Sequence, residues 1–201
     1  MQILDILDYI KKRGGYATLK ELKSAAFQTR DISRLIKEGS IEKIKPGLYR
    51  LPEFSFGVKF RGSLIDICRA IPDGVICLTS ALEFHDLTTF NPTEVFVAIP
   101  HASKPPQISY PPVRTFYFRE RFYVPGIQTE RTKTGTIKVY NREKTICDMF
   151  RYRNKLGEDL PIEGLKNYLR SRDANLTLLQ KYAVQCQVKT VMIPYLRALT
   201  G

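Results

Sequence analysis

The sequence predicts an α+β protein, with an N-terminal winged helix-turn-helix domain and a larger mixed α/β domain that holds a small sheet and C-terminal helices. Two observations lead to this prediction. Residues 2–51 follow the order helix, helix, turn, helix and two-stranded ribbon. Short apolar strands then follow until residue 140, and helical patterns fill the rest. We expect domains at 1–52 and 75–201, joined by a segment 53–74 that contains a helix from about residue 62 to 71.

The first helices are marked by their end signals. An amphipathic pattern at residues 2–12 stops at Gly14-Gly15. Thr18 and Glu21 have the spacing of a capping box, which predicts a helix at 19–26. The third helix starts at Gln28 or Thr29 and ends at Gly39.

The third helix has two opposite faces. At 100° per residue, Ile32, Leu35 and Ile36 share one side, whereas Arg30, Arg34 and Lys37 lie on the other, with Ser33 beside them. Such a helix can pack through its aliphatic side and enter a major groove through its basic side. Charges on the solvent face of a surface helix are common, so the basic stripe indicates DNA binding only together with the basic ribbon that follows and the net charge of +12.

A basic β-ribbon follows this helix directly. Residues 41–44 and 48–51 are two short strands, and Pro46-Gly47 makes the turn. Three helices alone are a common arrangement, but three helices followed without insertion by a basic hairpin are typical of a winged helix.

The C-terminal part begins with strands and ends with helices. A strand is expected at 74–79, a short helix from Ser80 to about His85, strands at 94–100 and 113–120, and a hairpin formed by 127–132 and 135–140. Asn141 is the expected N-cap of the first of several helices.

The charge favours a polyanionic partner. Thirty-two Lys and Arg residues face twenty Asp and Glu, which gives a net charge of +12. Basic side chains that neutralise phosphates release counterions from nucleic acid. An anionic membrane surface would also attract this charge, so the charge alone does not choose the partner.

The candidate DNA contacts follow from the third helix and the ribbon. Side chains near the start of a recognition helix reach base edges, where Arg pairs with guanine and Gln with adenine. We therefore expect base contacts from Gln28, Thr29, Arg30, Ser33 and Arg34. We expect phosphate contacts from Lys37, Lys43, Lys45 and Arg50, and a possible second basic surface from Arg151, Arg153, Arg170 and Arg172.

The sequence gives no sign of a metal, a cofactor or a membrane segment. The four Cys residues lack C-x-x-C spacing and there are only two His residues, so free buried thiols are expected rather than a metal site. The N-terminus carries acidic residues and no cleavage site, and no apolar run is long enough to span a bilayer. We expect a cytoplasmic protein.

Catalytic motifs are incomplete. Arg61-Gly62-Ser63 is not followed by the paired carboxylates that a nucleotidyltransferase needs for its metal, and no E-x-K lies in a central strand as in many nucleases. The pair His85-Asp86 lacks a nearby nucleophile in a recognisable pattern, so we expect His85 to be a helix cap or a core hydrogen-bonding group. Likewise, Glu143 is expected to serve a helix start.

Two other function classes stay open. The aromatic run at 116–123 is interleaved with Arg residues, which would suit stacking on RNA, although aromatic residues of a strand are more often buried. An RNA-binding or tRNA-associated factor with a winged-helix basic module is therefore the main alternative, and a nuclease fused to a DNA-binding domain is the weaker one.

Three segments resemble the AbiEi-type antitoxins of type IV toxin–antitoxin systems, which also regulate transcription in abortive infection. In the winged-helix module, Leu35, Gly39, Lys43, Gly47 and Tyr49 match the family pattern. Residues 80–85 resemble its Ser-Ala-Leu-x-x-His segment, and residues 141–148 resemble the segment before its C-terminal helices.

The resemblance implies a non-enzymatic phage-defence protein with two roles. The N-terminal domain would bind inverted repeats of double-stranded DNA in its own promoter and repress the operon. The C-terminal domain would antagonise a toxin that resembles a nucleotidyltransferase, without a stable complex between the two proteins.

Overall fold

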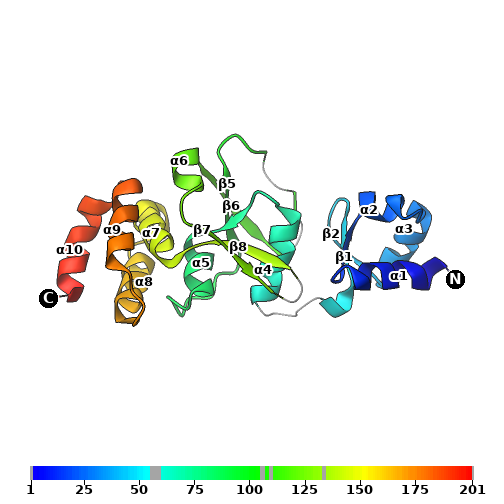
Figure 1. Ribbon diagram of the computed structural model, residues 1–201, viewed down its shortest axis with the longest axis horizontal. Helices are drawn as coiled ribbons and strands as arrows, with labels where there is room; N and C mark the ends of the chain where they lie inside the picture. The colour runs from blue at the N-terminus through cyan, green and yellow to red at the C-terminus, as the bar shows by residue number, and fades with distance from the viewer. Residues whose placement is uncertain (1, 55–59, 105–106, 109–110, 133–134, 201) are drawn as a thin grey trace. The chain divides into compact units, whose positions relative to one another are not determined.

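The computed structural model describes residues 2–54, 60–104, 107–108, 111–132 and 135–200. It divides into two compact units. The first comprises residues 1–72, 105–112 and 131–137, and the second comprises residues 73–104, 113–130 and 138–201. Figure 1 shows the order of their elements along the chain. The fold is α+β, as the sequence predicts.

The first unit contains a winged helix-turn-helix. Helices α1 (Gln2–Lys12), α2 (Leu19–Ser24) and α3 (Thr29–Lys37) are accompanied by strands β1 (Tyr16–Thr18), β2 (Glu42–Lys45) and β3 (Leu48–Arg50). The strands form an antiparallel sheet in the order β1-β3-β2. The sequence analysis missed β1, which has only three residues and no alternating pattern long enough to detect.

The helix-turn-helix is defined at its start and at its turn. Thr18 accepts a hydrogen bond from the Glu21 amide while the Glu21 carboxylate accepts from the Thr18 amide, so the predicted capping box is confirmed. Helix α2 ends at Ser24, earlier than predicted, because Ala26 adopts a left-handed conformation with φ of 65°. The turn that follows delivers the chain to Gln28, the N-cap of α3.

The wing is anchored to α2. The Leu19 amide at the start of α2 donates a 2.8 Å hydrogen bond to the carbonyl of Gly47, whose φ of 78° makes the turn between β2 and β3. Two segments follow the wing, the 3₁₀-helix η1 (Pro52–Phe54) and helix α4 (Phe60–Ala70). The side chain of Phe54 fills the space beside Gly15 that a Cβ atom would need.

A five-stranded mixed sheet extends through residues 75–140. Its strand order is β6-β5-β4-β8-β7. The strands are β4 (Val75–Ile76), β5 (Val95–Pro100), β6 (Val113–Phe118), β7 (Ile127–Arg131) and β8 (Thr136–Tyr140). Strand β5 runs antiparallel to β4 and parallel to β6, and β4 runs parallel to β8. Residues 133–134, between the last two strands, lie outside the described residues.

Helices complete the second unit (Figure 1). They are α5 (Leu78–Phe84), α6 (Glu120–Tyr123), α7 (Arg142–Leu156), α8 (Asp159–Arg170), α9 (Leu176–Gln185) and α10 (Lys189–Thr200). Asn141 caps α7 through the Lys144 amide, as predicted. The short α6, which the sequence analysis did not predict, contributes the buried Phe122 to the core.

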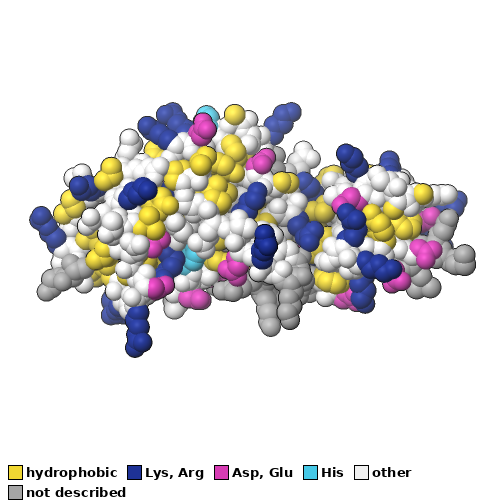
Figure 2. Space-filling model, in the orientation of Figure 1, with side chains coloured by type: hydrophobic (Ala, Val, Ile, Leu, Met, Phe, Trp, Pro, Cys, Tyr) yellow, Lys and Arg dark blue, Asp and Glu magenta, His cyan; other side chains and the backbone are white. Residues whose placement is uncertain are grey.

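The core explains the cysteines and the aromatic run. The structure describes all four cysteines and joins none of them in a disulfide; Cys77, Cys147 and Cys186 are buried, whereas Cys68 is partly exposed. Phe116, Phe118 and Phe122 are buried in the core of the second unit, so they cannot stack on RNA bases. Figure 2 shows Lys and Arg side chains spread over one face of the protein among Asp and Glu residues.

Candidate nucleic-acid interface

Helix α3 is anchored by its aliphatic face. Ile32 and Leu35 are 1% and 0% exposed, and they belong to a core that also contains Ile6, Ile10 and Leu22. Ile36 is partly buried and packs against the same core. Burial of these side chains fixes the rotation of α3, and therefore decides which residues point away from the domain.

The opposite face of α3 is open to solvent. Every residue predicted to contact DNA from this helix is exposed, namely Gln28, Thr29, Arg30, Ser33, Arg34 and Lys37. The Gln28 side chain makes no capping hydrogen bond, so its amide is not held by the helix end. Amide, hydroxyl and guanidinium groups on one helix face are the set of groups that reads base edges.

The guanidinium of Arg34 has an exposed partner. Its Nε atom donates a 2.7 Å hydrogen bond to the carboxylate of Glu38, and the two side chains are 63% and 43% exposed. This hydrogen bond raises the pKa of Arg34 above its ordinary value. Exposed pairs at this spacing contribute little to stability. Arg34 can therefore leave Glu38 and pair with a guanine at small cost.

The wing presents fewer cations than the sequence predicts. Lys43 on β2 is exposed, as a phosphate contact requires. Lys45 is only partly exposed, and its ammonium donates a 2.6 Å hydrogen bond to the carbonyl of Ala70 in α4. A lysine held in this way has to give up that bond before it can reach a phosphate.

Arg50, for which the sequence analysis predicts a phosphate contact, is buried in the structure. Arg50 is 5% exposed, and its guanidinium forms ion pairs with Glu42 on β2 and Asp66 on α4. The Tyr16 hydroxyl donates a 2.8 Å hydrogen bond to the other carboxylate oxygen of Asp66. Desolvation raises the pKa of Asp66, against the opposing effects of Tyr16 and Arg50. Arg50 thus connects the wing with α4 instead of facing solvent.

Two lysines of α2 were missed in the sequence analysis. Lys20 and Lys23 are exposed and line a hollow of about 670 Å³ between the start of α2 and Gly47 of the wing turn. Their spacing of three residues, with Leu22 buried between them, was the available signal. They add two exposed cations beside the turn of the wing.

The predicted second basic surface is only partly exposed. The Arg151 guanidinium lies 3.6 Å from the ring centre of Phe122, and Arg153 donates a 2.9 Å hydrogen bond to the Phe150 carbonyl. Both side chains are half-buried, whereas Arg170 and Arg172 are exposed. The two α7 arginines therefore support the core, and the structure brings only Arg170 and Arg172 to the surface.

The residues considered for catalysis have structural partners. His85 caps α5, and its Nε2 lies 2.7 Å from the carbonyl oxygen of Tyr140; burial lowers its pKa. The carboxylate of Glu143 accepts a 2.7 Å hydrogen bond from the Tyr168 hydroxyl. Asp148 is fully buried in an ion pair with Lys144, one helical turn away. Across the described ranges, no three His, Cys, Asp or Glu side chains are placed to hold a metal ion.

None of the helices, over the part of the chain that the structure describes, is long and apolar enough to cross a membrane.

Comparison with known proteins shows that the N-terminal module is similar to a known family. Residues 5–52 match a family model described as a transcriptional regulator, AbiEi antitoxin. The match begins within α1 and ends after β3, and it confirms the resemblance noted from the sequence for this module. The segments at 80–85 and 141–148 lie outside the matched range. No curated protein matches the chain.

Proposed function

Starting from an N-terminal domain of the AbiEi antitoxin and transcriptional regulator family, we propose that this protein represses its own operon and acts as the antitoxin of a type IV toxin–antitoxin system. We further propose that residues 1–52 form the DNA-binding domain, that residues 53–74 connect it, and that residues 75–201 form the antitoxin domain. The observation that carries the DNA-binding part is the orientation of α3, with Ile32 and Leu35 buried and Arg30 and Arg34 exposed.

In this proposal α3 enters the major groove. Gln28, Thr29 and Arg30 lie at its N-terminal end, where a recognition helix approaches the base edges most closely. Arg30 and Arg34 are one helical turn apart and would pair bidentately with guanines, while Gln28 would pair with an adenine. Ser33 lies between the two arginines along the chain and adds a small hydroxyl group to the same surface.

Phosphate contacts come from the sides of this surface. Lys37 at the end of α3 and Lys43 on β2 are exposed and long enough to reach the DNA backbone. Lys20 and Lys23 of α2 join them in this proposal. These contacts position the protein without reading sequence, so they make binding depend on salt.

Inverted repeats would be read by two copies of the chain. A repeat of this kind presents the same bases twice, related by a two-fold axis, and each α3 would occupy one half-site. Half-sites read from one face of the duplex are spaced by about one helical turn, roughly 34–36 Å, or by a multiple of that distance.

The antitoxin role is assigned to residues 75–201, without an enzymatic step. The carboxylates that could have served catalysis, Glu143 and Asp148, are committed to Tyr168 and Lys144. The proposed antagonist is a toxin that resembles a nucleotidyltransferase, and the antagonism does not require a stable complex. Two observations support this part: the family match of the N-terminal domain, and the resemblance of residues 80–85 and 141–148 to segments of the same family.

Two experiments test the two roles separately. For repression, a gel shift compares DNA from upstream of the gene's own operon with scrambled DNA of equal length and composition. Preferential binding to the upstream DNA supports the proposal, and equal binding rejects it. For antitoxin activity, residues 75–201 and the full chain are each expressed with the neighbouring gene product. Rescue of growth by the shorter fragment supports the assignment, and rescue by neither rejects it.

A further inference from the structure

The small sheet of the first unit is covered on both faces. Side chains of successive residues in a strand point to opposite faces of the sheet. On β1 and β3, Ala17 and Tyr49 belong to the core that also contains residues of α1, α2 and α3. Their neighbours Tyr16 and Arg50 lie directly opposite each other in the register, and they are 2% and 5% exposed. Because these two side chains point away from the helix-turn-helix, another element buries them.

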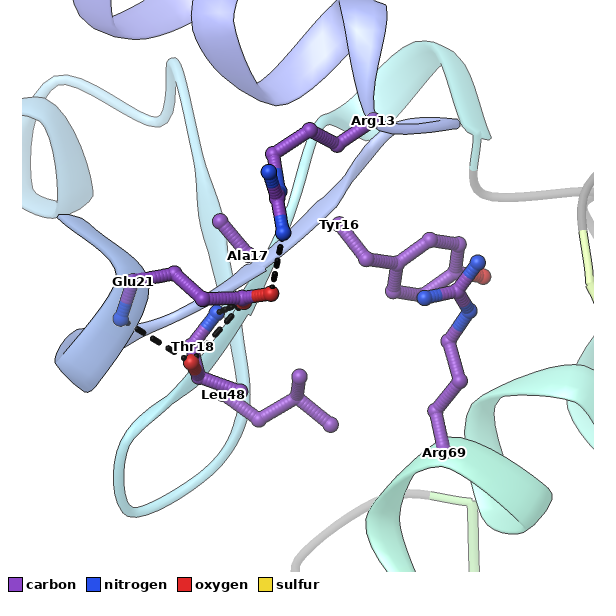
Figure 3. Close-up of a pocket in the computed structure, with 7 residues that line it drawn as sticks. All are labelled: Arg13, Tyr16, Ala17, Thr18, Glu21, Leu48 and Arg69. Atoms are coloured by element: carbon purple, nitrogen blue, oxygen red, sulfur yellow. Dashed lines mark hydrogen bonds and ion pairs between the residues drawn. The ribbon is translucent and has the colours of Figure 1, made fainter. Parts of the chain in front are cut away.

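That element is helix α4. Figure 3 shows Tyr16 and Leu48 pointing towards α4, whereas Ala17 points the other way. The guanidinium of Arg69 on α4 lies 4.2 Å from the ring centre of Tyr16. Helix α4 therefore packs on the face of the sheet that the helix-turn-helix does not cover.

A row of polar side chains joins all three strands to α4. In the register, Arg50 of β3 lies between Tyr16 of β1 and Glu42 of β2. The Asp66 carboxylate of α4 accepts a 2.8 Å hydrogen bond from the Tyr16 hydroxyl and forms an ion pair with Arg50. Arg50 also forms an ion pair with Glu42. A single carboxylate of α4 thus holds a residue of every strand, two directly and one through Arg50.

The wing depends on such support. Strand β2 has four residues and β3 has three, and their register is irregular between Lys43 and Lys45. A two-stranded hairpin alone is marginally stable at best in water. Strand β2 lies at the edge of the sheet, and its Lys45 ammonium donates a hydrogen bond to the Ala70 carbonyl of α4. Both ends of β2 are therefore attached to α4, Glu42 through Arg50 and Lys45 directly.

We propose that Asp66 is a positioning residue for DNA binding, and that α4 is part of the DNA-binding domain as well as a connection. Asp66 is buried and does not touch DNA itself. Exposed Lys43 lies between the two attached residues of β2, Glu42 and Lys45, so Asp66 sets the position from which Lys43 reaches a phosphate. The family match ends at residue 52, before α4 begins. The role in DNA binding rests on the proposed function, whereas the attachment of the wing to α4 does not.

The sign of the effect on DNA binding distinguishes positioning from charge. Asp66→Asn removes a negative charge, which by long-range attraction alone would strengthen DNA binding. Loss of a phosphate contact from the wing instead weakens binding about fivefold to tenfold near 0.1 M salt. It also lowers the slope of log K against log salt by about 1. Glu53→Gln, at an exposed position of η1, changes the net charge equally and is the matched control.

Amide hydrogen exchange of the full chain without DNA tests the attachment of the wing. Asp66→Asn should increase exchange in residues 42–50 more than in α3. Tyr16→Phe removes only the hydroxyl that donates to Asp66, and should give a smaller increase in the same residues. This second variant keeps the test decisive if Asp66→Asn does not fold. Glu53→Gln should exchange like the wild type. Unchanged exchange of the wing in both variants, or equal increases in the wing and in α3, overturns the proposal.

Fluorescence anisotropy with scrambled DNA tests the role in DNA binding, because phosphate contacts do not depend on sequence. Asp66→Asn should bind more weakly than the wild type and with a lower salt slope, whereas Glu53→Gln should bind at least as tightly as the wild type. Lys43→Ala should cause almost no further loss in the Asp66→Asn background, since the contact is already gone. Equal affinities of Asp66→Asn and Glu53→Gln, or a full further loss from Lys43→Ala, overturn the proposal.

The same measurement with upstream DNA separates this proposal from the repressor function. Asp66→Asn should lose affinity for upstream and scrambled DNA by the same factor, because α3 is anchored by the core with α1 and α2. A wild type without preference for upstream DNA contradicts the repressor function, and a weaker Asp66→Asn then still supports the positioning role. A wild type that binds neither DNA contradicts both.

Discussion

Arg50 on strand β3 and Asp66 on helix α4 form a buried ion pair that links the wing to a helix outside the helix-turn-helix. The two side chains are 6% and 3% exposed, and the Tyr16 hydroxyl completes the coordination of the carboxylate. The wing is therefore positioned by the segment that follows it as well as by its own hairpin, and this arrangement has measurable consequences.

Removing one member of this pair should destabilise the protein strongly. Asp66→Ala removes a buried carboxylate partner of Arg50, and loss of a buried partner costs about 3–5 kcal/mol. Urea denaturation followed by circular dichroism measures the free energy of unfolding. Lys11→Ala, which breaks the exposed pair with Glu53, is the control and should change stability little. Equal small losses in both variants would show that the Arg50–Asp66 pair does not hold the wing.

The pair between Lys144 and Asp148 makes a second stability prediction, in the second unit. Both side chains are 0% exposed, and the Lys144 ammonium lies 4.4 Å from the ring centre of Tyr140. Lys144→Met should cost about 3–5 kcal/mol because it leaves the Asp148 charge without its nearest cation. Adding Asp148→Leu to this variant should restore much of the loss, since two apolar side chains can replace a buried pair.

A double-mutant cycle over these variants tests whether Lys144 and Asp148 interact directly. Urea denaturation of the wild type, both single variants and the double variant gives the coupling energy between the two positions. Additive losses, with the double variant least stable of all, would contradict a direct pairing.

The environment of the Glu83 carboxylate predicts that the stability of the folded protein depends on pH. Its Oε2 atom is buried without a hydrogen-bond partner among the described residues, and desolvation, followed by the charge of Asp86, raises its pKa to about 7. The folded state therefore binds a proton more tightly than the unfolded state, whose Glu83 has the ordinary pKa of 4.5. The resulting stability is fully present below that ordinary pKa and is lost as the pH rises through 7.

Glu83→Gln tests this dependence, because glutamine resembles the protonated acid. The melting temperature of Glu83→Gln should exceed that of the wild type at alkaline pH and should converge with it in acid. Asp86→Asn, at an exposed neighbouring position, should show a smaller effect of the same sign. A difference between Glu83→Gln and wild type that does not vary with pH would contradict the assignment.

The wing makes a prediction about salt dependence. Lys43 is exposed, whereas Lys45 is bonded to the Ala70 carbonyl. Lys43→Ala should weaken binding to all DNA sequences and reduce the slope of log K against log salt by about 1. Lys45→Ala should leave the slope almost unchanged. The same slope change in both variants would mean that Lys45 leaves Ala70 when DNA binds.

Local patterns made the N-terminal fold predictable. The capping box at Thr18 and Glu21, the periodicity of Ile32 and Leu35, and the Pro46-Gly47 turn all act within a few residues, so their signals lie in the sequence. The exposed face of α3 followed from the same periodicity. The order of the five-stranded sheet could not be predicted, because it depends on pairings between distant segments such as β4 with β8.

Four of the predicted DNA contacts are held by partners that the sequence pattern does not reveal. Arg50 alternates with Tyr49 in a short basic strand and gives no sign of burial; its partner Asp66 comes from another helix, sixteen residues later. Lys45 donates a hydrogen bond to a backbone carbonyl of that same helix. Every residue has a backbone carbonyl, so the sequence does not show which one accepts this bond. Arg151 and Arg153 have the charge expected of a basic surface. Arg151, however, packs on the Phe122 ring of α6, and Arg153 donates a hydrogen bond to the Phe150 carbonyl of its own helix.

The measurement that tests the central claim most directly is the sequence discrimination of an Arg34→Ala variant. Fluorescence anisotropy at fixed salt compares binding to upstream DNA and scrambled DNA for the wild type, Arg34→Ala and Lys37→Ala. The wild type should prefer upstream DNA, and Arg34→Ala should lose about tenfold to a hundredfold in affinity for that DNA alone. Lys37→Ala should lose affinity for both DNAs equally. A wild type without preference, or an Arg34→Ala variant that keeps the full preference, would contradict the claim that α3 reads DNA through its exposed arginines.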